Sequence, residues 1–113
     1  MPGHDDLDLL RGTLDLLILK TLSWGPMHGL EVLRWIERAT KQRLQVEQGA
    51  LYPALHRMEQ KGWLDVEWGV TENSRKAKYY RLTARGRQQL TAELSKWTRY
   101  TEAVGLVLAA HHA

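Results

Sequence analysis

QGALYPALHRMEQKGWLDVEWGVTENSRKAKYYRLT, residues 48–83, decides the fold of this 113-residue chain, because its hydrophobic period changes at Gly62. The apolar residues before Gly62 recur at helical spacing; they are Leu51, Leu55 and Met58. Beyond it, apolar side chains recur at every second position, first at 64, 66 and 68 and later at 80 and 82, which is the period of a strand. The stretch therefore predicts a helix over residues 48–61 and a two-stranded hairpin whose loop spans residues 69–75.

Two further helices are predicted ahead of this stretch, over residues 9–23 and 28–40. In the first, a stripe at helical spacing is expected to face inward; it consists of Leu10, Leu14, Leu17, Ile18 and Leu22. Other leucines lie off that stripe, at positions 9, 16 and 19, so this helix needs cover beyond its own small domain. Trp24-Gly25-Pro26 ends the helix, and the segment from Gly25 to Gly29 is interpreted as a turn between helices.

A long last helix is predicted over residues 84–110, with Thr83 as its N-cap. Its apolar positions advance alternately by four and three residues, which is the seam of a coiled coil. The seam consists of Leu90, Leu94, Trp97, Thr101, Val104 and Leu108. A helix of this length is about 40 Å long, more than the width of so small a domain. We therefore expect a homodimer held by the seam together with Leu10 and Leu14 of the first helix.

The composition is that of one small domain. Lys and Arg total 16 against 13 Asp and Glu, a formal charge of +3, and the absence of cysteine excludes a disulfide framework and a thiol nucleophile. The first residues lack the basic region of a signal peptide, and the longest apolar run is too short to cross a bilayer. We expect a cytoplasmic protein without a membrane partner. Its predicted parts are a disordered acidic tail (1–8), a winged-helix domain (9–83) and a dimerisation helix (84–113).

Three helices followed by a hairpin form a winged helix-turn-helix, a mainly α fold in which the third helix enters the major groove of DNA. The outward face of that helix carries side chains able to reach base edges and phosphates: Tyr52, His56, Arg57, Gln60 and Lys61. Between positions 73 and 90 lie six cations and no acid: Arg75, Lys76, Lys78, Arg81, Arg85 and Arg87. Because such concentrated charge suits phosphate contacts, double-stranded DNA is the expected partner.

Residue sets typical of an enzyme are absent from the sequence. The histidines show no metal-ligand spacing apart from the adjacent pair at 111 and 112, and the carboxylates are scattered. The turn over residues 25–29 lacks the preceding strand and the lysine of a phosphate-binding loop. No catalytic residue, metal or cofactor is therefore predicted. One alternative stays open, a winged helix that binds a protein instead of DNA through Trp24, Trp63 and Trp68.

Four blocks of sequence follow one another in a specific order. They are Gly12-Thr-Leu-Asp-Leu-Leu-Ile-Leu, Gly25-Pro-Met-His-Gly29, Gln48-Gly-Ala-Leu-Tyr-Pro-Ala-Leu-His-Arg57 and Lys78-Tyr-Tyr-Arg-Leu-Thr83. Together they resemble the PadR family of bacterial transcriptional regulators, over residues 9–100. The single long C-terminal helix resembles the short subfamily rather than the one with an added multi-helix effector domain.

The resemblance implies a homodimeric repressor that binds an inverted repeat and releases it when an effector binds. Residues 49–57 match the start of the family's recognition helix, and residues 75–78 match its basic wing. The resemblance therefore implies that these residues contact DNA: Gly49, Tyr52, His56, Arg57, Arg75, Lys76 and Lys78. Three departures from the family stand out, and one of them is Leu30, which replaces a common Tyr after Gly29 and is expected to alter packing more than function. Ala50 stands where Ser or Thr is usual, so a hydroxyl that could hold a phosphate or base is missing, and Asn73-Ser74 stands where the wing often has glycine.

Trp97 supports two interpretations. It either packs within the dimer seam or forms a wall of an effector pocket between subunits, where paired flat rings would hold a planar molecule. Short members of the resembled family are thought to bind aromatic effectors in such a place. Leu10, Leu14 and Val104 would line the same space, and a small planar or aromatic effector is the predicted ligand.

Overall fold

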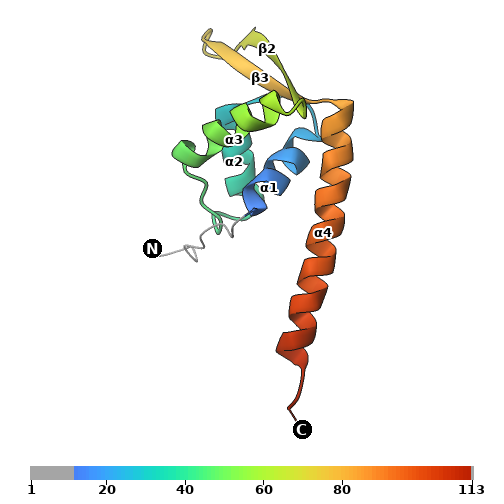
Figure 1. Ribbon diagram of the computed structural model, residues 1–113. Helices are drawn as coiled ribbons and strands as arrows, with labels where there is room; N and C mark the ends of the chain where they lie inside the picture. The colour runs from blue at the N-terminus through green and yellow to red at the C-terminus, as the bar shows by residue number, and fades with distance from the viewer. Residues whose placement is uncertain (1–11, 113) are drawn as a thin grey trace.

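The computed structural model describes residues 12–112. Within them lie the helices α1 (Thr13–Leu22), α2 (Gly29–Ala39), α3 (Gln48–Gln60) and α4 (Ala84–Ala109), and the strands β1 (Met27–His28), β2 (Leu64–Val70) and β3 (Lys76–Leu82). In Figure 1 the first three helices form one cluster beneath the sheet, and α4 runs from that cluster far beyond it. This confirms the predicted mainly helical fold with a winged-helix arrangement and a long C-terminal helix.

Helix α1 lies at the centre of the core and contacts every other helix as well as β3. Its buried side chains are Leu16, Ile18, Leu19, Thr21 and Leu22. Leu16 and Leu19, which lie off the predicted stripe, are buried as well, because α1 is covered on several sides by its own chain. Much of the cover that the sequence assigned to a partner is therefore supplied internally.

The start of α1 differs from the sequence prediction. Gly12 has a φ of 86°, so it precedes the helix, and Thr13 is the first helical residue. Of the helix predicted over residues 9–23, residues 9–11 lie outside the described part of the chain. The acidic tail predicted over residues 1–8, and with it any test of its disorder, also lies outside the described residues.

Helix α3 contains Pro53 at its sixth residue, in the second turn rather than the first. Proline has no N–H to donate to the carbonyl four residues earlier, which belongs to Gly49. Gly49 is exposed, so water can satisfy that carbonyl. On the opposite side Leu51, Leu55 and Met58 are fully buried, as predicted, and their burial keeps α3 against the core.

The sheet has three strands in the order β1-β3-β2, all antiparallel, where the sequence predicted two. Strand β1 comes from the segment interpreted as a plain turn, and it pairs Met27 with Tyr80. Leu64, Tyr80 and Leu82 face the core as the period of two predicted. Trp68 is 66% exposed, because the hairpin extends past the core before it turns.

Helix α4 begins against the turn that follows α3. Thr83 is its N-cap, as predicted: the hydroxyl accepts the N–H of Gly86 at 3.0 Å and donates to the Gly62 carbonyl at 2.7 Å. The Thr83 N–H donates to the Trp63 carbonyl at 3.0 Å. Gly86 is buried there, and a Cβ at this position would lie 2.1 Å from the carbonyl oxygen of Trp63. Only glycine therefore permits so close an approach.

We predict that Gly86→Ala lowers the free energy of unfolding by about 1–3 kcal/mol, because the methyl group overpacks a backbone contact that cannot move aside cheaply. The matched control is Gly105→Ala in the same helix, where a Cβ meets nothing within 4 Å. Alanine's helix propensity should make that variant more stable by up to about 1 kcal/mol. Urea unfolding at one protein concentration measures both changes, and equal effects at the two positions would contradict the prediction.

Candidate nucleic-acid interface

One face of α3 is open to solvent and polar. Its exposed residues include the predicted contacts Gly49, Tyr52, His56 and Arg57, and also Gln60. The buried residues on the other side of α3 orient this face outward. Hydroxyl, imidazole and amide groups on such a face can donate to and accept from base edges.

Tyr52 rests on the first residue of α2. A Cβ at Gly29 would lie 2.5 Å from Cε1 of Tyr52, so the absence of a side chain at Gly29 makes room for the ring. The tyrosine is nevertheless 43% exposed. Its ring is thus supported by α2 while much of it remains accessible on the α3 surface.

The wing tip is a five-residue turn between Val70 and Lys76. The Thr71 N–H donates to the Arg75 carbonyl at 2.8 Å, and the Arg75 N–H donates to the Thr71 hydroxyl at 3.3 Å. Ser74 has a φ of 60°, so it adopts the left-handed conformation that glycine favours. This turn places Arg75 and Lys76 in exposed positions.

The six cations of the basic stretch differ in their surroundings. Lys78 on β3 donates from Nζ to Oε1 of Glu59 on α3 at 3.1 Å. Arg81 lies 3.6 Å from Asp65 and 4.0 Å from Glu67, both on β2. The acids missing from the stretch itself are therefore supplied by neighbouring elements.

Two predicted DNA contacts at α3 also have partners within the protein. Arg57 forms an ion pair with Asp15 of α1, which ties the exposed side of α3 to the central helix. The Nζ of Lys61 lies 4.7 Å from the ring centroid of Trp63, a cation–π arrangement. Trp63 itself packs against the core.

The Glu59–Lys78 pair adjoins the core tyrosine of β3. The hydrogen bond to Glu59 raises the pKa of Lys78, and burial raises the pKa of Tyr80. The Lys78 ammonium lies 5.6 Å from the centroid of the Tyr80 ring. A charged lysine thus joins a carboxylate of α3 to an aromatic ring of the sheet.

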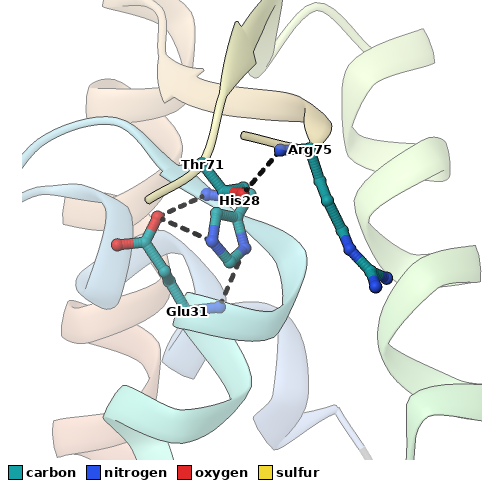
Figure 2. Close-up of polar contacts among 4 residues, drawn as sticks. All are labelled: His28, Glu31, Thr71 and Arg75. Carbon is teal, nitrogen blue, oxygen red and sulfur yellow. Dashed lines mark hydrogen bonds and ion pairs between the residues drawn. The ribbon is translucent and has the colours of Figure 1, made fainter. Parts of the chain in front are cut away.

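The N-terminus of α2 lies beside the wing. His28 Nδ1 accepts the Glu31 N–H at 3.3 Å, and Oε1 of Glu31 accepts the His28 N–H at 3.1 Å, so the two residues form a capping box. Figure 2 shows this cap, with the Thr71–Arg75 hydrogen bond above it and the Arg75 side chain extending away from both. A cleft of about 560 Å³ separates α2 from the wing, between residues that include Trp35 and Thr71.

Helix α4 leaves most of its predicted seam uncovered. Leu90 is buried by the domain, but Leu94, Trp97 and Val104 are 42%, 37% and 37% exposed, and Leu108 is 81% exposed. Thr101 is exposed too. Figure 1 shows why: only the first turns of α4 lie beside the helical cluster.

A cavity of about 390 Å³ lies between the start of α1 and the middle of α4. Trp97 lines it, together with Leu16, Glu93 and Tyr100. Of the other residues predicted to line an effector pocket, Leu14 packs against the core and Val104 is exposed farther along α4. Leu10 lies outside the described residues.

Within residues 12–112 no group of histidine and carboxylate side chains is arranged to hold a metal ion. In the same part of the chain, no helix is both long enough and apolar enough to cross a membrane.

Sequence reasoning missed the residues that hold the site together. Asp15 and Glu59 each pair with a predicted DNA contact, and Gly29 makes room for Tyr52. The two ion pairs join positions 42 and 19 residues apart. No local pattern marks such distant partners, so only the fold could identify them.

Comparison with known proteins identifies the family. Residues 18–92, from within α1 to the start of α4, match the transcriptional regulator PadR-like family. A PadR family transcriptional regulator from Eggerthella lenta is 30% identical, with a TM-score of 0.78 and coverage of 89% of this chain and 86% of that one. For a transcriptional regulator from Clostridium thermocellum the identity is 26% and the TM-score 0.77, over 84% of this chain and 92% of the other.

A PadR-like transcriptional regulator from Bacillus cereus is 25% identical, with a TM-score of 0.76, over 90% of this chain and 97% of that protein. The family and these relatives are transcriptional regulators, not enzymes. The matched residues contain α3 and the whole wing. The chain therefore belongs to the PadR-like family of transcriptional regulators, as its four sequence blocks predicted.

Proposed function

We propose that this protein is a DNA-binding repressor that occupies an inverted-repeat operator as a homodimer and blocks the promoter sterically. The observation that carries the proposal is the conjunction of an exposed polar face on α3 with two cations at the tip of the neighbouring wing, Arg75 and Lys76. In this arrangement α3 reads base edges in the major groove, and the wing contacts phosphates beside it.

The proposed DNA surface has two kinds of residue. Tyr52, His56 and Gln60 supply hydrogen-bonding groups for bases, while the N–H of Gly49 and the side chains of Lys61, Arg75 and Lys76 reach phosphates. Arg57 and Lys78 are each held by a carboxylate. Before either could bind a phosphate, it would have to exchange that partner.

We predict that replacing Arg75 and Lys76 together by alanine weakens binding to a duplex that the unchanged protein selects from a random pool. Each lost phosphate contact should reduce the slope of log K against log[salt] by about 0.9. The charge-matched control is the pair Lys96→Ala and Arg99→Ala on α4, which should leave the slope nearly unchanged. The proposal would be refuted if the unchanged protein gave a slope of zero or bound no duplex in preference to random DNA. Either result would favour a winged helix that binds a protein.

The homodimer is proposed from the uncovered part of α4. At the seam positions Leu94 and Trp97 are only partly covered by their own domain and Leu108 is 81% exposed, and a second copy would bury them in a self-complementary contact. Two α3 helices would then face half-sites separated by about 34 Å, one helical turn of DNA, or a multiple of it.

We expect the pair Leu94→Asp and Leu108→Asp to give monomers in sedimentation velocity, because each copy would bring buried, unpaired carboxylates into the seam. Ser95→Asp with Ala103→Asp is the control, since both residues are exposed on the same helix but off the seam. A dimer that survives the first pair would show that another surface holds the subunits together.

The proposed effector is a small planar molecule that binds beside Trp97. The cavity between α1 and α4 offers two aromatic side chains, Trp97 and Tyr100, next to the apolar Leu16. A ligand held between these helices would change the angle at which α4 leaves the domain, and with it the spacing of the two α3 helices. Release of DNA would follow from that change of spacing.

Titration with acridine, a planar aromatic dye, tests this site. Trp97→Ala should weaken dye binding about tenfold, through lost stacking and lost apolar contact. Trp24→Ala removes the same side chain from a position that is 65% exposed and outside the cavity, so it should bind the dye normally. If Trp97→Ala binds the dye as tightly as the unchanged protein, Trp97 only packs against its neighbours and does not bind the effector.

A further inference from the structure

The ion pair between Glu59 and Lys78 joins the two DNA-facing parts of the domain. Glu59 lies in the last turn of α3, and Lys78 lies in the second half of the hairpin, on β3. Their Nζ–Oε1 distance is 3.1 Å, and the side chains are only 32% and 33% exposed. A bond between α3 and β3 restrains the angle between the helix and the wing.

The surroundings of Lys78 hold its ammonium group on the protein. The hydrogen bond that Lys78 donates to Glu59 raises the pKa of the lysine, so it remains charged, and the centroid of the Tyr80 ring lies 5.6 Å from the same nitrogen. Tyr80 is 5% exposed and is part of the core. The lysine is thus directed back across the sheet toward α3.

The wing-tip cations differ from Lys78 in this respect. The side chain of Arg75 extends away from the turn (Figure 2). Lys76 is exposed, and within the described residues neither side chain has an ion-pair partner. The wing therefore contains cations of two kinds, free ones at its tip and an internally paired one nearer its base. From the sequence alone, Arg75, Lys76 and Lys78 are equivalent candidates for phosphate contacts.

We propose that Glu59 and Lys78 are positioning residues, whose ion pair sets the angle between α3 and the wing so that both reach the same stretch of DNA, while Lys78 neutralises no phosphate itself. The inference rests on the proposed DNA-binding function. It follows because a wing that keeps its phosphate contacts while its angle to α3 changes shifts the helix away from the base edges that it reads, and the base contacts weaken while the number of phosphate contacts stays the same.

The direction in which Glu59→Gln changes DNA affinity distinguishes a positioning role of Lys78 from a direct phosphate contact. Glu59→Gln removes a negative charge near DNA and frees Lys78, so a lysine that binds phosphate should then bind it better. A positioning pair predicts the reverse: Glu59→Gln weakens binding, by up to about fivefold per subunit, the upper range for a partly exposed pair. Lys78→Met should weaken binding by a similar factor, and the double variant by no more than either single one.

The experiment measures affinity and salt dependence for these three variants on the duplex selected by the unchanged protein. The slope of log K against log[salt] should stay at its original value in Lys78→Met, and fall by about 0.9 per lost contact in the control Lys76→Met. Unfolding midpoints measured by circular dichroism confirm that each variant is folded. If Lys78→Met fails to fold, the direction of the affinity change in Glu59→Gln still tests the inference. If Glu59→Gln fails to fold, the salt slope of Lys78→Met tests it.

Three outcomes would overturn this inference alone. The first two are tighter binding by Glu59→Gln and a reduced salt slope in Lys78→Met that matches the Lys76→Met control. Additive losses in the double variant would also overturn it, because residues that act as one pair cannot be lost twice. If the unchanged protein shows no salt-dependent DNA binding, the proposed function fails and this inference fails with it.

Discussion

Burial of α1 is the constraint on which the rest of the structure depends. Ile18, Leu19 and Leu22 are at most 1% exposed, and the helix contacts α2, α3, α4 and β3. A domain of this size has room for one such core, so the other helices and β3 are placed by their contact with α1, and β1 and β2 by their pairing with β3. The same helix contacts both the DNA-facing α3 and the long α4.

The distribution of charge follows from that packing. Cations that are consecutive in sequence meet different acids once the elements are assembled: Glu59 for Lys78, Asp65 and Glu67 for Arg81. Partly exposed pairs of this kind contribute little stability, about 0–1 kcal/mol each. The pairs join α3 and β2 to β3, and among the described residues they leave Arg75 and Lys76 at the wing tip without an ion-pair partner.

Local patterns predicted much of this fold. The change of period at Gly62, the Thr83 cap and the burial of Leu51, Leu55 and Met58 depend on neighbouring residues, and all three are found in the structure. Strand β1 was missed because two residues have no period of their own, and Met27 becomes a strand only by pairing with Tyr80. The inward face of α1 was misassigned because a helix covered on several sides has no single stripe.

The sequence by itself determined the family, the order of the helices and the hairpin, and the chemical types presented by α3, because these depend on residue identity and local spacing. Only the tertiary structure decided which residues stand together: Tyr52 on Gly29, Arg57 with Asp15, Lys78 with Glu59, and Trp97 beside Leu16 and Tyr100. The physical reason is that a contact between distant parts of a chain is set by packing around a shared core. No pattern within either partner's own segment encodes that contact.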